Sequence, residues 1–339
     1  MARELVARYQ AEVRFVGTER GLETRLVPAA GFKLELIHVG PLKNVSLRTR
    51  LNTLMDLPRG FFACRSLVKT FRPAVVFGVG GYASGPGMAA ALASGVPTMA
   101  FEPNAMPGLA NRLVGKRVAA AAVNFPAAAR WFRNVEVTGV PVRPEFFSVG
   151  PAPAGPPHLL IFGGSQGARI FNQTLPKIIA ALLDAVPGLT VLHQAGARHA
   201  DATLEAYTQS GADPARWQVS AFLDDMPARI QRAHLVMARS GASTVAELAA
   251  AGKPSLLVPF AAAADDHQTR NAEEMARAGA AELLPESALA APAHLLEALQ
   301  RLLGDSARLE AMSAAARTQA HPDAAARIAA RIAALAGIS

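Results

Sequence analysis

The chain has 339 residues, of which 51% are hydrophobic and 18% are charged. This composition is typical of a soluble α/β protein with a substantial core, in two ordinary domains or one large one. The 34 lysines and arginines exceed the 26 acidic residues and favour an anionic partner, but the 6% aromatic content and the lack of a nucleic-acid-binding motif argue against nucleic acid. The single cysteine, Cys64, excludes an internal disulfide framework, and its apolar neighbours predict a core residue rather than a nucleophile.

The N-terminal part combines a helix, a strand and a basic segment. The sequence MARELVARYQ (1–10) predicts a helix and VRFVGT (13–18) a strand, and no apolar segment typical of a signal peptide follows the first charges. Residues 42–72 carry seven Lys/Arg against one Asp, interleaved with Leu47, Leu51, Leu54, Met55, Phe61 and Phe62. This pattern favours attachment to an anionic membrane surface, although an amphipathic helix with a solvated basic face would share it. No apolar run reaches the roughly 18–20 residues that span a bilayer.

Strands and helices alternate along the rest of the chain. An apolar strand, a Gly/Ser turn, an alanine-rich helix and a second apolar strand are predicted within 74–104, and the same order recurs in 158–196 and 234–260. This alternation predicts parallel sheets with ligands at the carboxyl ends of the strands. Residues 307–337, rich in alanine and arginine, are predicted to be helices that close the second domain, and a last helix that packs back across the cleft stays an open alternative.

A proline-rich segment divides the chain. Four prolines and a glycine stand within residues 151–157, which is typical of a linker. We therefore predict an N-terminal domain over 1–145, a linker over 146–156 and a C-terminal domain over 157–339, with the ligand cleft between the two domains.

The turn RSGAST (239–244) and the helix that follows it contain a single acidic residue, Glu247. A Gly/Ser turn that leads into a helix presents unpaired N–H groups and the positive end of the helix dipole, which suits a phosphate. Gly241 gives the phosphate access to the backbone, Ser243 and Thr244 can cap the helix or contact the phosphate, and Glu247 can accept both ribose hydroxyls. These residues therefore predict a nucleotide-diphosphate site, with a ligand-free capping box from Ser243 or Thr244 to Glu247 as the alternative.

Several segments together resemble the MurG family of peptidoglycan glycosyltransferases: GVGGYASGPGMAAALASGVPTMAFEPNAMPGLANRL, TGVPVRPE, IFGGSQGARIFNQTLP, FLDDM and ARSGASTVAELAAAGKPSLLVPF followed by AAAADDHQTRNAEEMARAGAA. The resemblance runs from about residue 12 to the C-terminus. It implies a GT-B fold, in which two Rossmann-like domains face a cleft. The implied reaction is inverting transfer of N-acetylglucosamine from UDP-N-acetylglucosamine to undecaprenyl-pyrophosphoryl-muramoyl-pentapeptide, which converts lipid I to lipid II. The enzyme is then expected peripherally on the cytoplasmic face of the cell membrane, near other cell-wall synthesis or division proteins.

The same resemblance assigns roles to individual residues. It places Ser165 against the donor diphosphate, the main chain of Leu223 against the uracil, and Gln268 against hydroxyls of the transferred sugar. Arg143 and Asn104 are expected to complete the donor site from the first domain and the hinge. The phosphate and ribose are expected at Ala242, Ser243, Thr244, Val245, Ala246 and Glu247. No cofactor is implied.

Two departures from the family pattern bear on the mechanism. The first strand and the first glycine-rich loop of the N-terminal domain, GGTGGH in the family, have no counterpart, and a family HEQN motif is FEPN here. The absent central strand is expected to leave a gap flanked by unpaired backbone groups, and a mis-chosen start codon is its simplest explanation. The loop's histidine is absent too, so Glu102 is the candidate base, and we expect the chain to bind the donor but to transfer the sugar poorly.

Other polar residues are predicted to have structural roles. The adjacent pairs Asp224–Asp225 and Asp265–Asp266 do not suggest a metal site, because neighbouring side chains diverge and a helix dipole already serves the diphosphate. His267 is expected to line the cleft, and His38, His193 and His234 are expected in the core or at strand edges.

Other functions remain open from the sequence. They are a UDP-N-acetylglucosamine 2-epimerase or another lipid glycosyltransferase, a donor-binding but catalytically impaired protein, a division-site scaffold, and an NAD-dependent oxidoreductase with Glu19 behind the strand at 13–18. The last is disfavoured, because no glycine fingerprint precedes that strand.

Overall fold

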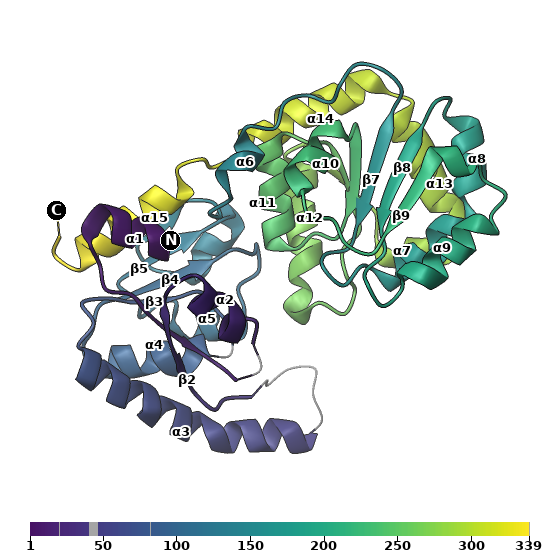
Figure 1. Cartoon of the computed structure of the whole chain (residues 1–339). Helices are drawn as coiled ribbons and strands as arrows, with labels where there is room; N and C mark the ends of the chain where they lie inside the picture. Colours follow the sequence, from purple (N-terminus) through teal and green to yellow (C-terminus); the bar gives the residue numbers. More distant parts are fainter. Residues whose placement is uncertain (20, 41–46, 82, 339) are drawn as a thin grey trace. The chain divides into compact units, whose positions relative to one another are not determined.

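The computed structural model describes residues 1–19, 21–40, 47–81 and 83–338, except for the side chains of 47–55. The chain forms two compact units, Met1–Pro141 with Asp323–Ser339, and Val142–Pro322. In each unit helices accompany parallel strands (Figure 1). Among the described helices, none combines the length and the apolar composition needed to cross a bilayer.

The strands of the first unit form two separate parallel sheets. In the smaller sheet, β1 (Arg14–Gly17) pairs with β2 (Lys33–Leu36). The larger sheet has four strands in chain order, namely β3 (Val76–Gly78), β4 (Thr98–Glu102), β5 (Ala120–Val123) and β6 (Val135–Val137). The accompanying helices are α1 (Ala2–Tyr9), α2 (Glu23–Ala29), α3 (Leu47–Phe71), α4 (Ser84–Ala93), α5 (Leu109–Val114), η1 (Pro126–Trp131) and α15 (Ala324–Leu335).

The core of the first unit lies on both faces of the four-stranded sheet. Met88 of α4 and Phe132 pack on one face, and Met99 of β4 packs with Ile328 and Ile332 of α15 on the other. The last helix of the chain therefore belongs to the first unit. Its side chains at i and i+4 supply the apolar stripe that this face needs.

The two sheets of the first unit differ in burial. Every residue of β4 and β5 is buried, whereas β1 and β3 each have one buried residue. Helix α4 contacts β1 as well as β3 and β4. Within the described residues, β1 and β3 each pair with a strand on one side only. The expectation that a central strand is missing stays a prediction.

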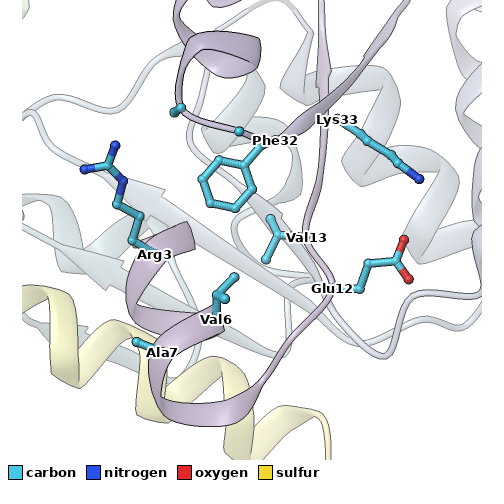
Figure 2. A pocket seen from close by; sticks show the side chains of 9 residues that line it. Arg3, Val6, Ala7, Glu12, Val13, Phe32 and Lys33 are labelled. Carbon is cyan, nitrogen blue, oxygen red and sulfur yellow. The ribbon is translucent and has the colours of Figure 1, made fainter.

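A cavity of about 650 Å³ also lies in the first unit. Its walls come from α1, the residues before β1 and the turn before β2. Val6, Val13 and Phe32 project into it, while the charged ends of Arg3 and Lys33 lie toward its rim (Figure 2). None of the residues that line this cavity is among those predicted to bind the nucleotide.

The second unit is built on one parallel sheet in the order β12-β11-β10-β7-β8-β9. These strands are β7 (His158–Phe162), β8 (Thr190–Gln194), β9 (Trp217–Ser220), β10 (Leu235–Ala238), β11 (Ser255–Leu257) and β12 (Ala281–Leu283). The chain proceeds outward from β7 through β8 to β9, and then returns to the other side of β7 as β10. The carboxyl ends of β7 and β10 therefore form a topological switch point, where such sheets bind ligands.

Helices of the second unit cover this sheet. They are α6 (Pro144–Phe147), α7 (Arg169–Thr174), η2 (Leu175–Lys177), α8 (Ile179–Ala185), α9 (Ala200–Thr208), η3 (Pro214–Arg216), α10 (Met226–Arg232), α11 (Ala242–Ala251), η4 (Ala264–Asp266), α12 (His267–Arg277), η5 (Glu286–Ala290), α13 (Pro292–Leu303) and α14 (Ser306–Thr318). The main core joins β7, β8 and β10 to α7, α8 and α13.

The division of the chain differs from the predicted boundaries in two places. The second unit begins at Val142, so the predicted linker, 146–156, lies within it. Phe146 is fully buried there, and the carbonyl of Val149 accepts a hydrogen bond of 3.2 Å from Arg317. The segment from Asp323 onward belongs to the first unit rather than closing the second. A proline-rich composition does not reveal such tertiary contacts.

Candidate functional site

The amino end of α11 is open. Gly241 is its N-cap residue, without a side-chain cap hydrogen bond, and the first helical amides belong to Ala242, Ser243 and Thr244. A Cβ atom added at Gly241 would meet only Thr244 Oγ1, at 3.9 Å. The alternative of a capping box is therefore wrong, because Ser243 and Thr244 lie inside the first turn rather than at the N-cap. Val245 and Ala246 are buried, and the helix contacts α6, α12 and α14.

Glu247 lies about one turn into α11 and is partly buried. Burial raises the pKa of its carboxyl, and the charge of Arg143 partly opposes this rise. Arg143 is the N-cap residue of α6, which contacts α11. The predicted assignment of Arg143 to the first domain is therefore wrong, because it belongs to the second unit together with Glu247.

The turn after β7 comes close to the end of β8. A Cβ atom on Gly167, whose φ is +73°, would lie 2.0 Å from the carbonyl oxygen of Ala195. One on Gly196 would lie 2.1 Å from the carbonyl oxygen of Gln166. Gly167 and Gly196 thus allow the turn after β7 to pack closely against the backbone after β8. Ser165 is exposed in the same turn, at the carboxyl end of β7.

Gln268 lies in the first turn of α12 and its side chain is already oriented. Its Oε1 accepts a hydrogen bond of 3.0 Å from the N–H of Phe260, and its carbonyl accepts one of 2.8 Å from Ser240 Oγ. Ser240 directly precedes the mouth of α11, so Gln268 is tied to the same switch-point region as the predicted phosphate site.

The loop after β9 carries Leu223, which is buried beside the exposed Phe222. In this loop Ser220 Oγ donates a hydrogen bond of 2.7 Å to the carbonyl of Phe222. Asp225 caps α10 by accepting a hydrogen bond of 3.3 Å from the N–H of Ala228. Asp225 therefore has the structural role predicted for it.

Glu102 belongs to the first unit and is only 2% exposed. Its Oε1 accepts hydrogen bonds from the N–H and Nδ2 of Asn104, at 3.0 and 3.1 Å. Its Oε2 accepts hydrogen bonds from Gly108 N and Asn111 Nδ2, at 3.1 and 2.9 Å. These contacts favour a structural role for Glu102 over the predicted base role, because each of its buried carboxylate oxygens already accepts two hydrogen bonds; the base role stays a prediction. Glu102 fixes the loop that carries Asn104.

The other singled-out residues divide into core and surface positions. Burial raises the pKa of the Cys64 thiol to about 11 and lowers that of His193 to about 3, as expected for core residues. His234 accepts a hydrogen bond from the N–H of His158 at a strand edge, also as predicted. His38 is exposed two residues beyond the end of β2 and lies 3.9 Å from Asp56, so it is not a core residue.

Two residues that the sequence analysis missed stand beside this site. Arg239, only 9% exposed, directly follows β10 and forms an ion pair of 3.0 Å with Glu286 of η5. An arginine directly after a fully apolar strand is the signal that would have singled it out, because a buried cation needs a partner.

The predicted membrane segment coincides in part with α3. The segment 41–46 and the side chains of Leu47, Arg48, Arg50, Leu51, Leu54 and Met55 lie outside the described residues. In the described part, Phe62 is 63% exposed and the side chain of Arg59 is 81% exposed. An exposed aromatic ring and a guanidinium thus stand close together on this helix.

Comparisons with known proteins agree with this architecture. Residues 1–123 match the glycosyltransferase family 28 N-terminal domain, and residues 158–328 match the family's C-terminal domain. Two relatives are named UDP-N-acetylglucosamine--N-acetylmuramyl-(pentapeptide) pyrophosphoryl-undecaprenol N-acetylglucosamine transferase. The Solibacter usitatus protein is 42% identical over 97% of this chain and 89% of its own length, and the Anaeromyxobacter sp. (strain K) protein is 43% identical over 97% and 86%.

A solved structure gives the same result. The crystal structure of Acinetobacter baumannii MurG superposes with a TM-score of 0.83 at 29% identity, covering 98% of this chain and 94% of that chain. The predicted GT-B architecture of two Rossmann-like domains is thereby confirmed. This chain belongs to glycosyltransferase family 28, among the MurG proteins.

Proposed function

We propose that this chain transfers N-acetylglucosamine from UDP-N-acetylglucosamine to the undecaprenyl-pyrophosphoryl-muramoyl-pentapeptide, and so converts lipid I to lipid II in peptidoglycan synthesis. The names of its relatives describe this donor and this acceptor. The observation that carries the proposal in the structure is the open, uncapped mouth of α11 at the switch point of the second sheet, with Glu247 one turn behind it.

The donor is proposed to bind with its diphosphate at the amides of Ala242, Ser243 and Thr244. A helix amino terminus offers N–H donors and a positive potential, so it stabilises the pyrophosphate without a metal ion. Glu247 then accepts hydrogen bonds from both ribose hydroxyls. Arg143, whose charge opposes the rise in the pKa of Glu247, favours the ionised carboxylate that this role requires.

The remaining donor contacts are proposed from the loops around this mouth. Ser165 contacts the diphosphate from the turn after β7, and the main chain of Leu223 receives the uracil from the loop after β9. Gln268 binds hydroxyls of the transferred sugar. Asn104 of the first unit adds a contact to the donor, and its loop is held for this purpose by Glu102.

The chemistry is a single displacement at the anomeric carbon. An acceptor hydroxyl loses its proton to a base and attacks as the bond to UDP breaks, and the negative charge that develops on the leaving diphosphate is stabilised by the α11 amides. This stabilisation grows in the transition state, so it lowers the barrier rather than only tightening ground-state binding.

Transfer is tested with labelled UDP-N-acetylglucosamine and a lipid-linked muramoyl-pentapeptide acceptor. The proposal expects label in the lipid product, in proportion to the UDP released. Free N-acetylmannosamine or its UDP derivative in the absence of acceptor would indicate an epimerase instead. Donor binding without either product would indicate a donor-binding protein that is catalytically impaired.

Attachment to the cytoplasmic face of the membrane is proposed through α3 and the segment before it. The exposed Phe62 and Arg59 are the described members of the apolar and basic pattern in 42–72. Flotation with anionic liposomes tests this attachment. Neutralising Arg48, Arg50 and Arg59 should abolish flotation, and equal flotation of the neutralised variant would contradict it. Association with cell-wall synthesis or division proteins is expected at this cytoplasmic face of the membrane.

A further inference from the structure

One peptide group is held from both sides beside the mouth of α11. The carbonyl of Pro259 accepts a hydrogen bond of 3.0 Å from Arg239 Nη1, and the N–H of Phe260 donates one of 3.0 Å to Gln268 Oε1. These two groups belong to the same peptide bond. In a trans peptide the C=O and N–H point in opposite directions, so the orientation of this peptide links the positions of Arg239 and Gln268.

Glu286 completes the arrangement behind Arg239. Its Oε1 accepts a hydrogen bond of 3.0 Å from Arg239 Nη2, and its Oε2 accepts one of 2.7 Å from the N–H of Ala261. Partial burial alone would raise the pKa of Glu286, but these two hydrogen bonds outweigh it and hold the pKa below its ordinary value. Glu286 is therefore an ionised partner at neutral pH.

The guanidinium of Arg239 has little freedom to move. Its Nη1 also donates to the carbonyl of Val258, at 3.1 Å, and its carbon lies 4.9 Å from the ring centroid of Phe171 and 5.3 Å from that of Phe260. The side chain thus extends from the end of β10 to the segment after β11 and to η5. It acts on the backbone that carries Phe260 rather than on a ligand.

The consequence for Gln268 is chemical as well as geometric. The hydrogen bond from the N–H of Phe260 fixes which end of the amide is the oxygen, and the other end is the nitrogen Nε2, which only donates hydrogen bonds. Held in this way, Gln268 presents donors to hydroxyl oxygens of a sugar. A flipped amide would present an oxygen and lose the hydrogen bond with Phe260.

We propose that Glu286 is a positioning residue for recognition of the donor sugar. It acts through Arg239 and the Pro259–Phe260 peptide, and it keeps Gln268 with its amide nitrogen toward the sugar hydroxyls. This inference rests on the proposed function, because it takes the ligand at Gln268 to be the sugar of UDP-N-acetylglucosamine. Glu286 itself contacts neither the sugar nor the nucleotide.

The test compares binding of UDP and UDP-N-acetylglucosamine by calorimetry in the full-length chain. Glu286→Ala should weaken UDP-N-acetylglucosamine about fivefold to tenfold, as expected for the loss of about one hydrogen bond, and leave UDP within about twofold. Glu286→Gln keeps an oxygen acceptor for Arg239 or Ala261 and should fall between Glu286→Ala and wild type. Gln268→Ala should show the same sugar-selective loss, and adding Glu286→Ala to it should cause no further loss.

Glu282→Ala is the matched control. Like Glu286, Glu282 has two hydrogen-bond partners, here the side chains of Arg301 and Arg308, and its side chain has the same 20% exposure as that of Glu286. None of these bonds connects Glu282 to Arg239 or to the loop after β11, so the Glu282→Ala variant should bind both ligands as wild type does. Thermal melting checks that each variant is folded. Where Glu286→Ala melts below the assay temperature, Glu286→Gln carries the comparison.

The outcomes separate this inference from the function on which it rests. Equal weakening of both ligands by Glu286→Ala, no weakening of either, or losses that add to those of Gln268→Ala would overturn the positioning role. A wild-type chain that binds neither ligand would overturn the proposed function, and the positioning role with it.

Discussion

Replacing Glu102 by glutamine separates a structural carboxylate from a catalytic one. Glutamine keeps the shape but places an NH₂ group where one oxygen accepts two hydrogen bonds. Asn111 is only 1% exposed, whereas Asn104 and Gly108 can reach water, so the NH₂ group should turn toward Asn104. The loss of charged acceptors beside a buried donor is expected to cost about 2–3 kcal/mol of unfolding free energy.

The assay is thermal unfolding alongside steady-state transfer. At roughly 2–4 °C per kcal/mol, Glu102→Gln should lower the melting temperature of the first unit by about 5–10 °C. Glu136→Gln is the control in the same unit, because the half-exposed ion pair of Glu136 with Arg327 is worth about 1 kcal/mol or less. A Glu102→Gln variant that melts like wild type but loses more than about 100-fold in kcat would refute the structural role and favour the base role.

Three further predictions follow from other parts of the molecule. Burial raises the pKa of the Glu247 carboxyl, so ionisation of this group destabilises the folded state as the pH rises. The melting temperature of Glu247→Gln should therefore exceed that of wild type at pH 7, and the difference should disappear toward about pH 4. Gly167→Ala should cost several kcal/mol more in denaturant unfolding than Gly164→Ala, because both glycines have positive φ but only the first Cβ meets a carbonyl, at 2.0 Å. Amide hydrogen exchange should be faster in β1 and β2 than in β4 and β5, since an isolated strand pair is marginally stable; equal protection would contradict this.

The strand and helix pattern of the chain was predictable because the spacing of apolar residues and the positions of glycine and proline are local properties of the sequence. The buried strands at 158–162 and 235–238 and the helix that starts at 242 all follow the apolar runs and glycine turns in the sequence. The glycine turn after β10 and the alternation of strands and helices predicted the place of Glu247 in the helix behind the carboxyl end of a strand, whereas the role of Ser165 came from the family resemblance.

The features that were not predictable depend on long-range contacts. No local signal shows that α15 covers the four-stranded sheet of the first unit, or that Phe146 and Arg143 belong to the second unit. The role of Glu102 depends on Gly108 and Asn111, six and nine residues along the chain. The ion pair of Arg239 with Glu286 spans 47 residues, so a sequence pattern reveals the buried arginine but not its partner.

The most direct test of the donor site is the affinity for UDP of Glu247→Ala, measured against wild type with UDP and with a 2′,3′-dideoxy analogue of UDP. If Glu247 receives both ribose hydroxyls at the mouth of α11, the variant should bind UDP at least about tenfold more weakly and lose the wild-type preference for UDP over the analogue. A variant that binds UDP as tightly as wild type and keeps that preference would contradict the account.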